Sequence, residues 1–364
     1  MKVRIGSKTK SFRTVSFDSV RNEVVLIEQR LLPHRFELFR CKDFKATAKA
    51  ITDMVVRGAG AIGATAAYGF AQGLRAFKGQ NQSKFEAHKE RVYETLAAAR
   101  PTAVDPVNAM NGIRARLSGS IAEQQDIALR GAEDFADEDA RHCAEIGVHG
   151  AKLITEGMRV LTHCNAGWLA FVDVGSATAP IYAARDQGRK FHVYCSETRP
   201  RCQGATLTAW ELAQEGISHQ VLSDNAAGHL MQRGRVDLVI VGSDRTLGRT
   251  GEVANKIGTY TRAVLAHRHK IPFYVAIPLS TIDWNLKSGF DIPIEERSES
   301  EVLGAWGVTS RGRREYVRVA NPTSGAVNPG FDVTPAELIT GIITPAGIFK
   351  PKDLWKNKAR LGAA

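Results

Sequence analysis

The sequence of 364 residues has few cysteines, few aromatic residues and no long apolar run. Its cysteines are widely spaced and form no C-x-x-C pair, so the sequence supports neither a disulfide framework nor a zinc site. The five are Cys41, Cys143, Cys164, Cys195 and Cys202. No run approaches the roughly 20 apolar residues that span a bilayer. The N-terminal MKVRIGSKTK has no apolar stretch behind its charges, so we expect no secretory signal. We therefore expect a cytoplasmic protein with no membrane partner.

The formal net charge is +11, and a charge of this size favours a polyanionic partner when the cations are concentrated. Lys and Arg are instead spread along the chain, with local excesses only at 310–318 and 350–360. No basic motif interleaved with aromatic residues accompanies them. We therefore expect a solvated basic surface and a pocket for an anionic substrate, and no nucleic acid partner.

The pattern of apolar residues divides the chain into two parts, and a chain of this length also favours two domains. Val-, Ile- and Phe-rich runs predict short strands in the first 45 residues or so, and apolar residues at three- and four-residue spacing predict helices from there to about residue 156. Beyond Gly157, runs such as RVLTHC and VDLVIVGSD alternate with helical segments, which indicates βαβ units and a parallel sheet. We predict an α/β protein with a β-containing and helical domain at 1–155 and a parallel-sheet domain at 156–364.

Two of the predicted strands are followed by side chains that can act in catalysis. VLTHCNAG places Cys164, and VDLVIVGSDR places Asp244, just beyond an apolar run. Ligands of open α/β sheets bind outside the carboxyl ends of the strands, so the pair suggests acid/base chemistry on a small molecule. Each residue has a plainer interpretation. A free cysteine is usually a small buried hydrophobe, and Asp244 could cap a helix or pair with Arg245.

The run Gly58-Ala59-Gly60-Ala61-Ile62-Gly63 matches the dinucleotide fingerprint G-x-G-x-x-G. We reject a nicotinamide cofactor, because the segment before the run is helix-like and no acidic residue follows about 20 positions later. The glycines, with Arg57 beside them, instead fit a helix N-terminus that grips phosphate. The alternative is a helix–helix contact that requires small residues.

Further polar residues follow other strands at the same predicted sheet edge. ETRP at 197–200 and Gln203 follow the run KFHVYCS. Asn255 and Lys256 are predicted to open a helix beyond Asp244, where a phosphate could bind.

These residues stand in motifs that resemble one known family over nearly the whole length. The motifs are RGAGAIG, RPTAV, THCNAG, ETRPRCQGATLTAWEL, GSDR, ANKIGTY, IPFYVAIPLSTID, IPIEER and NPGFDVTPAELITGIIT. The chain resembles the methylthioribose-1-phosphate isomerases, within the wider family of translation-initiation-factor-2B-like proteins. The resemblance implies a small N-terminal domain joined to a Rossmann-like domain, usually as a homodimer.

By resemblance, the chain is expected to convert an aldose 1-phosphate into the ketose 1-phosphate in methionine salvage, with no metal and no nicotinamide. Cys164 and Asp244 would form the catalytic pair, with Asp244 as proton donor. The substrate-binding residues would be Arg57, Gly58, Ala59, Arg100, Gln203, Asn255 and Lys256. Two alternatives stay open: an isomerase of 5-deoxyribose 1-phosphate or a related pentose phosphate, and a non-catalytic regulatory subunit of the initiation-factor-2B type.

The chain departs from the family pattern at several positions. Gly60 replaces a common proline, Trp168 a smaller residue, Thr206 a frequent arginine and Pro345 a usual acid, and the segment at 246–252 is one residue longer. We expect these changes to alter the rim of the site. They leave the substituent at C5 of the substrate open.

Overall fold

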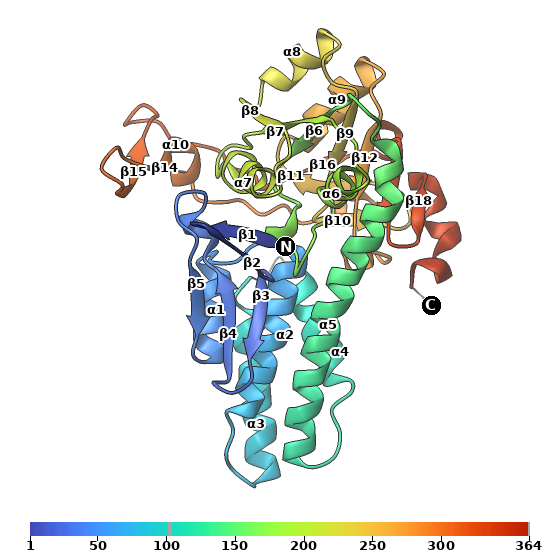
Figure 1. The fold of residues 1–364 in the computed structure, drawn as a ribbon. Coiled ribbons are helices and arrows are strands. Elements are labelled where there is room, and N and C mark those ends of the chain that lie inside the picture. Colours follow the sequence, from blue (N-terminus) through green and yellow to red (C-terminus); the bar gives the residue numbers. More distant parts are fainter. Residues whose placement is uncertain (101–103, 363–364) are drawn as a thin grey trace.

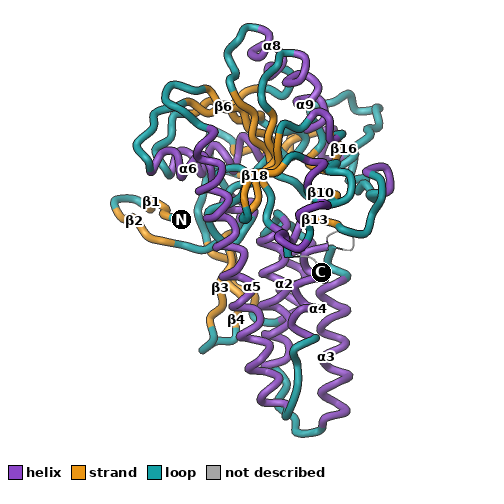
Figure 2. The backbone as a smooth tube through the Cα atoms, turned by 90° about the vertical axis from the view of Figure 1, so that its right-hand side faces the viewer, coloured by secondary structure: helices purple, strands orange, loops and turns teal. Residues whose placement is uncertain are grey.

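The structure is a computed structural model that describes residues 1–100 and 104–362. The sequence also predicts a break in helix at 100–102, because proline disfavours helix in the residue before it, and this segment lies mostly outside the described ranges. Figure 1 shows two parts, a sheet-based body above and a bundle of helices with short strands below. Figure 2 shows from the side that the long helices extend away beneath the strands.

The N-terminal part begins with short strands, as predicted. They are β1 (Lys2–Ile5), β2 (Lys8–Ser11), β3 (Val15–Asp18), β4 (Glu23–Ile27) and β5 (Leu38–Cys41), and β3, β4 and β5 form an antiparallel sheet. The helices are α1 (Phe44–Thr52), α2 (Ala59–Arg75), α3 (Gln82–Ala97), α4 (Val104–Arg114) and α5 (Ile121–Gly150).

Helix α2 forms the centre of the bundle, and its residues 60–74 are all buried. Its glycines allow this close packing. A Cβ atom at Gly69 would lie 2.7 Å from a methyl group of Thr47, and one at Gly73 would lie 2.5 Å from Val92. Within the run at 58–63, a Cβ atom at Gly60 would lie 2.3 Å from Asp139 and one at Gly63 3.0 Å from Phe135, so these two glycines serve the helix–helix contact that the sequence left as an alternative.

The C-terminal part contains a seven-stranded sheet in the order β18-β17-β12-β9-β6-β7-β8. All neighbouring pairs are parallel except β17 with β18. The strands are β6 (Arg159–His163), β7 (His192–Ser196), β8 (His219–Leu222), β9 (Leu238–Val241), β12 (Phe273–Ala276), β17 (Gly341–Thr344) and β18 (Gly347–Phe349). This mostly parallel sheet confirms the predicted α/β class.

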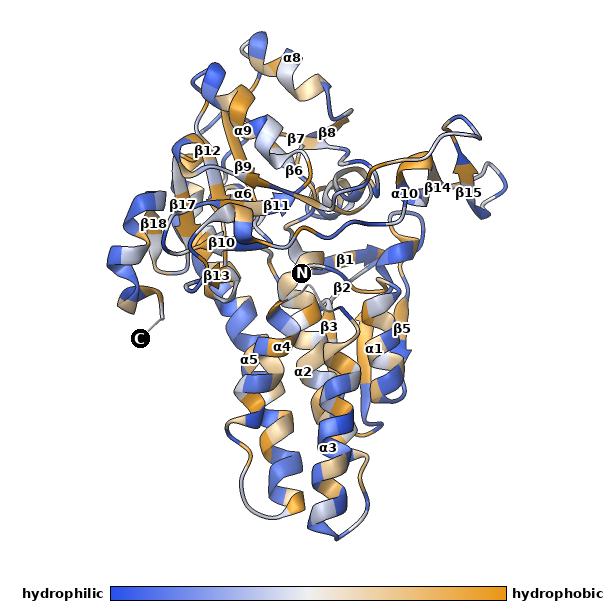
Figure 3. Cartoon of the chain, turned by 180° about the vertical axis from the view of Figure 1, so that it is seen from behind, coloured by the Kyte–Doolittle hydropathy of each residue, from blue (hydrophilic) through white to orange (hydrophobic). Residues whose placement is uncertain are grey.

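Helices cover both faces of this sheet. They are α6 (Ala179–Asp186), α7 (Ala209–Gln214), α8 (Ala226–Gln232) and α9 (Thr259–Arg268). One face packs against α8 and α9, and the other against α6, α7 and the end of α5. All four residues of β9 are buried, and this strand is coloured as hydrophobic inside the upper body in Figure 3. Because the central strands β6, β9, β12 and β17 are mostly buried on both faces, their sequences are largely apolar.

Additional strands form the lower edge of this part and a projecting arm. A four-stranded sheet has the order β13-β10-β11-β16, and a separate hairpin joins β14 and β15. These strands are β10 (Arg245–Leu247), β11 (Val253–Lys256), β13 (Ile282–Asp283), β14 (Gly304–Val308), β15 (Arg314–Arg318) and β16 (Phe331–Thr334), with the short helix α10 (Ser300–Leu303) before the hairpin. Figure 1 shows the hairpin projecting from the body.

The prediction that Asn255 and Lys256 open a helix is wrong. Both residues lie in β11, which pairs with β10 and β16, and the helix begins only at Thr259 after a left-handed turn at Gly258 (φ 97°). Pairing with strands distant along the chain outweighs the local pattern.

Within the described ranges, no helix is both long and apolar enough to cross a membrane. The division into domains at residue 155 stays a prediction. The two parts share a hydrophobic cluster, in which Val3 and Leu32 pack with Trp168 and Trp210.

Candidate active site

One cavity lies between the N-terminus of α2 and the carboxyl ends of β6 and β9, with β11 on one wall. All nine residues expected to act in catalysis or substrate binding line it. They are Arg57, Gly58, Ala59, Arg100, Cys164, Gln203, Asp244, Asn255 and Lys256. The structure therefore brings together residues that are spread over 200 positions of the chain.

The N-terminus of α2 supplies one wall of the cavity. Gly58 precedes the helix with φ 95°, and a Cβ atom there would lie 2.4 Å from Cα of Ala170, so only glycine fits. The first turn of a helix has N–H groups without intrahelical acceptors and carries the positive end of the helix dipole. This wall is therefore suited to a phosphate.

Arg57 is buried and fixed by the residue that follows Cys164. Its guanidinium donates from Nη1 to Oδ1 of Asn165 and from Nη2 to the carbonyl oxygen of Asn165 at 2.7 Å. Burial lowers the pKa of Arg57, and the nearby carboxyl of Glu211 offsets part of this effect. A guanidinium has five N–H donors, so three remain for an anion in the cavity.

Asn165 is itself held by the buried Glu211. Nδ2 of Asn165 donates to Oε1 of Glu211 at 2.8 Å, and Glu211 also accepts from the hydroxyl of Tyr182 at 2.7 Å. Burial raises the pKa of Glu211, while its hydrogen-bond donors lower it. The series Arg57–Asn165–Glu211 therefore orients a cation toward the cavity through groups that are all buried.

Asp244 stands three residues beyond the end of β9, with its carboxylate facing the cavity. Its backbone N–H donates to the carbonyl oxygen of Ala254 at 2.9 Å. Its carboxylate has no hydrogen bond or ion pair with any residue that the structure describes. The side chain is exposed to the cavity, and the protein atoms around it raise the pKa of Asp244 by desolvation, while the charges of Arg100 and Lys256 lower it. A carboxyl of raised pKa and no fixed partner is suited to give a proton to a ligand.

Lys256 and Asn255 extend from β11 into the same cavity. Nζ of Lys256 donates to the carbonyl oxygen of Gly330 at 2.8 Å and lies over the ring of Phe331. Burial lowers the pKa of Lys256 to about 8. Nδ2 of Asn255 donates to the hydroxyl of Thr259 at 3.0 Å. Gln203, on the opposite wall, is 6% exposed, and its Oε1 has no partner among the described residues, so it can accept from a ligand hydroxyl.

Several cavity residues were not singled out from the sequence. Glu295 is the most prominent of them, because it places a second carboxylate in the cavity and lies 3.5 Å from Nη2 of Arg100. It belongs to the run IPIEER, which carried the resemblance but was given no role. The others are Met54, Ile62, Asn165, Ala166, Ala170, Phe171, Ser243, Arg245, Ile292, Pro293 and Phe331.

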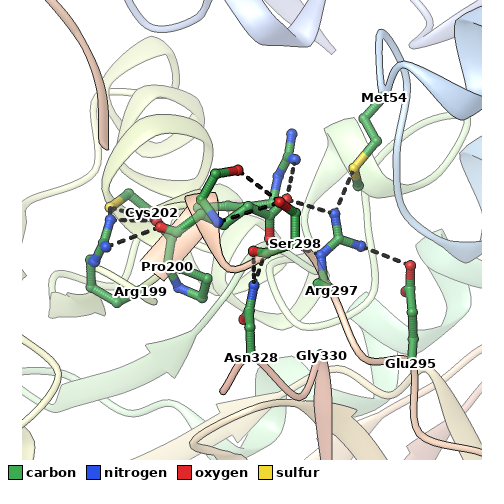
Figure 4. A network of polar contacts seen from close by, with 12 residues as sticks. Met54, Arg199, Pro200, Cys202, Glu295, Arg297, Ser298, Asn328 and Gly330 are labelled. Carbon is green, nitrogen blue, oxygen red and sulfur yellow. Dashed lines mark hydrogen bonds and ion pairs between the residues drawn. The ribbon is translucent and has the colours of Figure 1, made fainter. Parts of the chain in front are cut away.

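A network of polar contacts holds the segment that carries Glu295. Arg297 donates to Glu295 at 3.1 Å and to Glu301 at 2.9 Å, and its Nη2 lies 3.2 Å from Sδ of Met54 (Figure 4). Asn328 donates to the carbonyl oxygen of Ser298 at 2.9 Å (Figure 4). The position of Glu295 is therefore set from three segments of the chain.

The expectation that the departures from the family pattern alter the rim of the site stays a prediction for Thr206, because the neighbouring cavity that it lines shares Met54, Arg57 and Gln203 with this one, and the structure gives the expectation no support at the other positions. None of these positions lines the cavity that holds the nine residues. Trp168 is buried and stacks on Trp210, with ring centroids 5.8 Å apart, and Gly60 faces Asp139 of α5. Thr206 lines a neighbouring cavity beneath the β14–β15 hairpin.

Over the described part of the chain, no group of three His, Cys, Asp or Glu side chains could hold a metal ion. The fingerprint-like run at 58–63 follows α1 and a turn, so it lacks the strand that a dinucleotide site requires.

Comparisons with known proteins agree with these observations. The model of the initiation factor 2 subunit family matches residues 55–351. The chain is 49% identical to a methylthioribose-1-phosphate isomerase of Methylorubrum extorquens, over 93% of each chain. It is 47% identical to another of that name from Methylocella silvestris, over 98% of this chain and 97% of the relative.

Solved structures share the whole fold. One is 5-methylthioribose 1-phosphate isomerase from Pyrococcus horikoshii, with a TM-score of 0.83, 40% identity and coverage of 97% of this chain and 96% of that one. Another is described as the delta subunit of translation initiation factor eIF-2B from A. fulgidus, with a TM-score of 0.80, 38% identity and coverage of 94% and 97%. The resemblance seen in the sequence motifs is therefore confirmed, and the chain belongs to the methylthioribose-1-phosphate isomerases of the initiation factor 2 subunit family.

Proposed function

We propose that the protein is an aldose–ketose isomerase that converts 5-methylthioribose 1-phosphate into 5-methylthioribulose 1-phosphate. The observation that carries the proposal is the cavity lined by both Cys164 and Asp244 together with the cations Arg57, Arg100 and Lys256. The methylthioribose-1-phosphate isomerases among the relatives, at up to 49% identity, support this substrate.

The cations and the N-terminus of α2 serve to bind the phosphate. Arg57 offers a planar set of donors that matches phosphate oxygens, and Lys256 adds a point charge on the other side of the cavity. Gln203 and Asn255 offer amide groups to the sugar hydroxyls. Binding through a group that does not react holds the sugar carbons in place for the chemical step.

The reaction requires an acid, because the phosphate on C1 locks the sugar ring. Asp244 donates its proton to the ring oxygen as the bond between that oxygen and C1 breaks. A hydrogen then moves from C2 to C1, and the C2 hydroxyl loses its proton as the ketone forms. That proton returns to Asp244, so the reaction neither consumes nor releases a proton overall. Cys164 lies on the cavity wall as the second group near C1 and C2, and these roles hold whether the hydrogen moves as a proton or as a hydride.

One experiment distinguishes the proposed function from the two alternatives. The purified chain is incubated with 1-phosphates of 5-methylthioribose, 5-deoxyribose and ribose, and ketose formation is followed by phosphorus NMR. We expect the highest kcat/KM with the methylthio sugar. Preference for 5-deoxyribose 1-phosphate would move the assignment to a related pentose phosphate. Absence of turnover with all three would favour the non-catalytic subunit, since one structural relative is described as a subunit of eIF-2B.

The resemblance also implies an assembly, and we propose a homodimer. Sedimentation of the purified chain tests this, and a single species of monomer mass at micromolar concentration would contradict it.

A further inference from the structure

The backbone of Cys164 has a conformation that cysteine rarely adopts. Its φ angle is +63°, in the left-handed region, whereas the strand that precedes it is extended. Non-glycine residues are held in this region only where the surroundings determine it, and such residues cluster at functional sites. Something in the structure must therefore hold Cys164 there.

Two threonine hydroxyls bond to both sides of Cys164. Its N–H donates to Oγ1 of Thr198 at 2.8 Å, and its carbonyl oxygen accepts from Oγ1 of Thr208 at 2.7 Å. Thr198 follows β7, and Thr208 directly precedes α7. Both are buried, at 0% and 1% exposure, and neither lines the cavity. Their contact with Cys164 is therefore structural and not made through a ligand.

Thr198 is fixed by an ion pair between the partly buried Asp224 and the buried Arg262. It is itself left-handed, at φ +65°, which is exceptional for a β-branched residue. Its N–H donates to Oδ1 of Asp224 at 3.0 Å, and the same oxygen accepts from Nη2 of Arg262 at 2.6 Å. Its hydroxyl donates to the carbonyl oxygen of Ser196 at 2.9 Å, lies 3.2 Å from Nδ1 of His163 and accepts from the N–H of Cys164.

Thr208 links the thiol side of the site to the phosphate side. Besides donating to Cys164, its hydroxyl accepts from Nδ2 of Asn165 at 3.1 Å. Asn165 is the residue that holds the guanidinium of Arg57. One hydroxyl thus fixes the backbone of the thiol residue and the side chain that orients the cation.

We propose that Thr198 and Thr208 are positioning residues that hold the left-handed backbone of Cys164 and thereby aim its thiol at the reacting carbons of the substrate. The inference rests on the proposed function, in which Cys164 acts near C1 and C2. The proposal gives a role to Thr198 of the ETRP motif and to Thr208 at the end of GATLT. Neither threonine lines the cavity.

The test removes each hydroxyl and keeps the shape of the side chain. Thr198→Val leaves the N–H of Cys164 without its acceptor, and Thr208→Val leaves the carbonyl oxygen without its donor. We expect kcat to fall roughly 10- to 100-fold, because a displacement of about 1 Å at a reacting group has effects of this size. KM should change little, since the phosphate is bound by other residues. Thr198→Ser keeps the hydroxyl and should restore most of kcat.

A second measurement follows the thiol without any substrate. The rate at which iodoacetamide alkylates Cys164 is read from its peptide by mass spectrometry. We expect the rate to rise several-fold in both valine variants, because the half-buried thiol is no longer confined. Thr65→Val is the matched control. Thr65 is also fully buried, but its hydroxyl donates at 2.7 Å to Ala61 within α2, far from Cys164 in the chain.

The outcomes test the positioning role of the two threonines separately from the proposed function. Wild-type kcat and wild-type alkylation in both valine variants would overturn the proposal, as would equal losses in Thr65→Val. If Thr198→Val does not fold, Thr208→Val carries the test alone. A wild-type chain that turns over no sugar phosphate would reject the proposed function, while the alkylation rates would still decide whether the threonines hold the thiol.

Discussion

Arg57 and Asn165 join the two parts of the molecule at the site. Arg57 belongs to the helical part, just before α2, and Asn165 directly follows Cys164 at the end of β6. Nη2 of Arg57 lies 2.7 Å from the carbonyl oxygen of Asn165, and Nη1 reaches the side chain of the same residue. The cation proposed to bind phosphate and the thiol proposed to act near C1 are therefore held by adjacent residues.

Arg57→Ala should weaken substrate binding. The loss of a charge-assisted hydrogen bond to phosphate costs about 1.5–3 kcal/mol, so KM for 5-methylthioribose 1-phosphate should rise roughly 10- to 100-fold. Part of the loss should also reach kcat, because the phosphate orients C1 and C2. Steady-state kinetics over a range of substrate concentrations separate the two, and Arg116→Ala, at an exposed pair with Asp134, is the control. An unchanged KM would remove Arg57 from the phosphate site.

Lys256 should give the reaction a pH dependence near 8. Its pKa is lowered by burial to about 8, so its positive charge, present below that value, is lost as the pH rises through it. Arginine stays charged throughout this range. The ratio of kcat/KM for the wild type to that of Lys256→Arg should therefore fall about tenfold per pH unit above 8, whatever other groups titrate. A ratio independent of pH would show that the charge of Lys256 does not bind the substrate.

Asp105 should destabilise the fold at neutral pH. Its side chain is 4% exposed, Oδ1 has no partner among the residues described, and burial raises its pKa to about 7. In the unfolded chain an aspartate titrates near 3.9. Between these values the unfolded chain loses the proton while the native state keeps it, so the free energy of unfolding falls as the pH rises from about 4 to 7.

Asp105→Asn removes this titration. Relative to the wild type, the variant should gain on the order of 3 kcal/mol in the free energy of unfolding between pH 4.5 and pH 8, measured in urea. Asp18→Asn is the control, because the backbone N–H of Arg21 and the side chain of Arg40 lower the pKa of Asp18. The contribution of Asp18 to stability therefore changes only below about pH 4, and this variant should show the same effect at both pH values. Equal effects of Asp105→Asn at the two pH values would contradict the account.

The fingerprint-like run should bind no dinucleotide. A Cβ atom at Gly60 would lie 2.3 Å from Oδ1 of Asp139, so this glycine serves the contact between α2 and α5. Calorimetric titration with NAD and NADP at millimolar concentration should give no binding heat, whereas the sugar phosphate should. Tight binding of either dinucleotide, lost on changing Gly60, would show that the run was wrongly dismissed.

The sequence predicted the sheet and the residues of the cavity well, for a physical reason. Parallel strands deliver the residues that follow them to one edge, so Cys164 and Asp244 meet although 80 positions separate them. Asn255 and Lys256 lie in a strand because they pair with residues 70 or more positions later, such as Phe331. The local sequence pattern does not show such distant pairing.

Loop residues and side-chain directions were harder to predict. Glu295 lies in an irregular segment whose position depends on ion pairs with Arg100 and Arg297. Trp168 follows Cys164 closely in sequence, yet its side chain packs into the core against Trp210. Distance along the chain from a site residue does not determine which way a side chain points.

The most direct test of the account is the turnover of 5-methylthioribose 1-phosphate by Asp244→Asn. An amide has nearly the shape of the carboxyl but no proton to give, and the phosphate is bound elsewhere, so KM should stay near the wild-type value. We predict that kcat falls by roughly 10²–10⁴, the usual contribution of general acid–base catalysis. A variant that is folded, binds the substrate and keeps near-normal kcat would show that the carboxylate is structural and that the proposed mechanism is wrong.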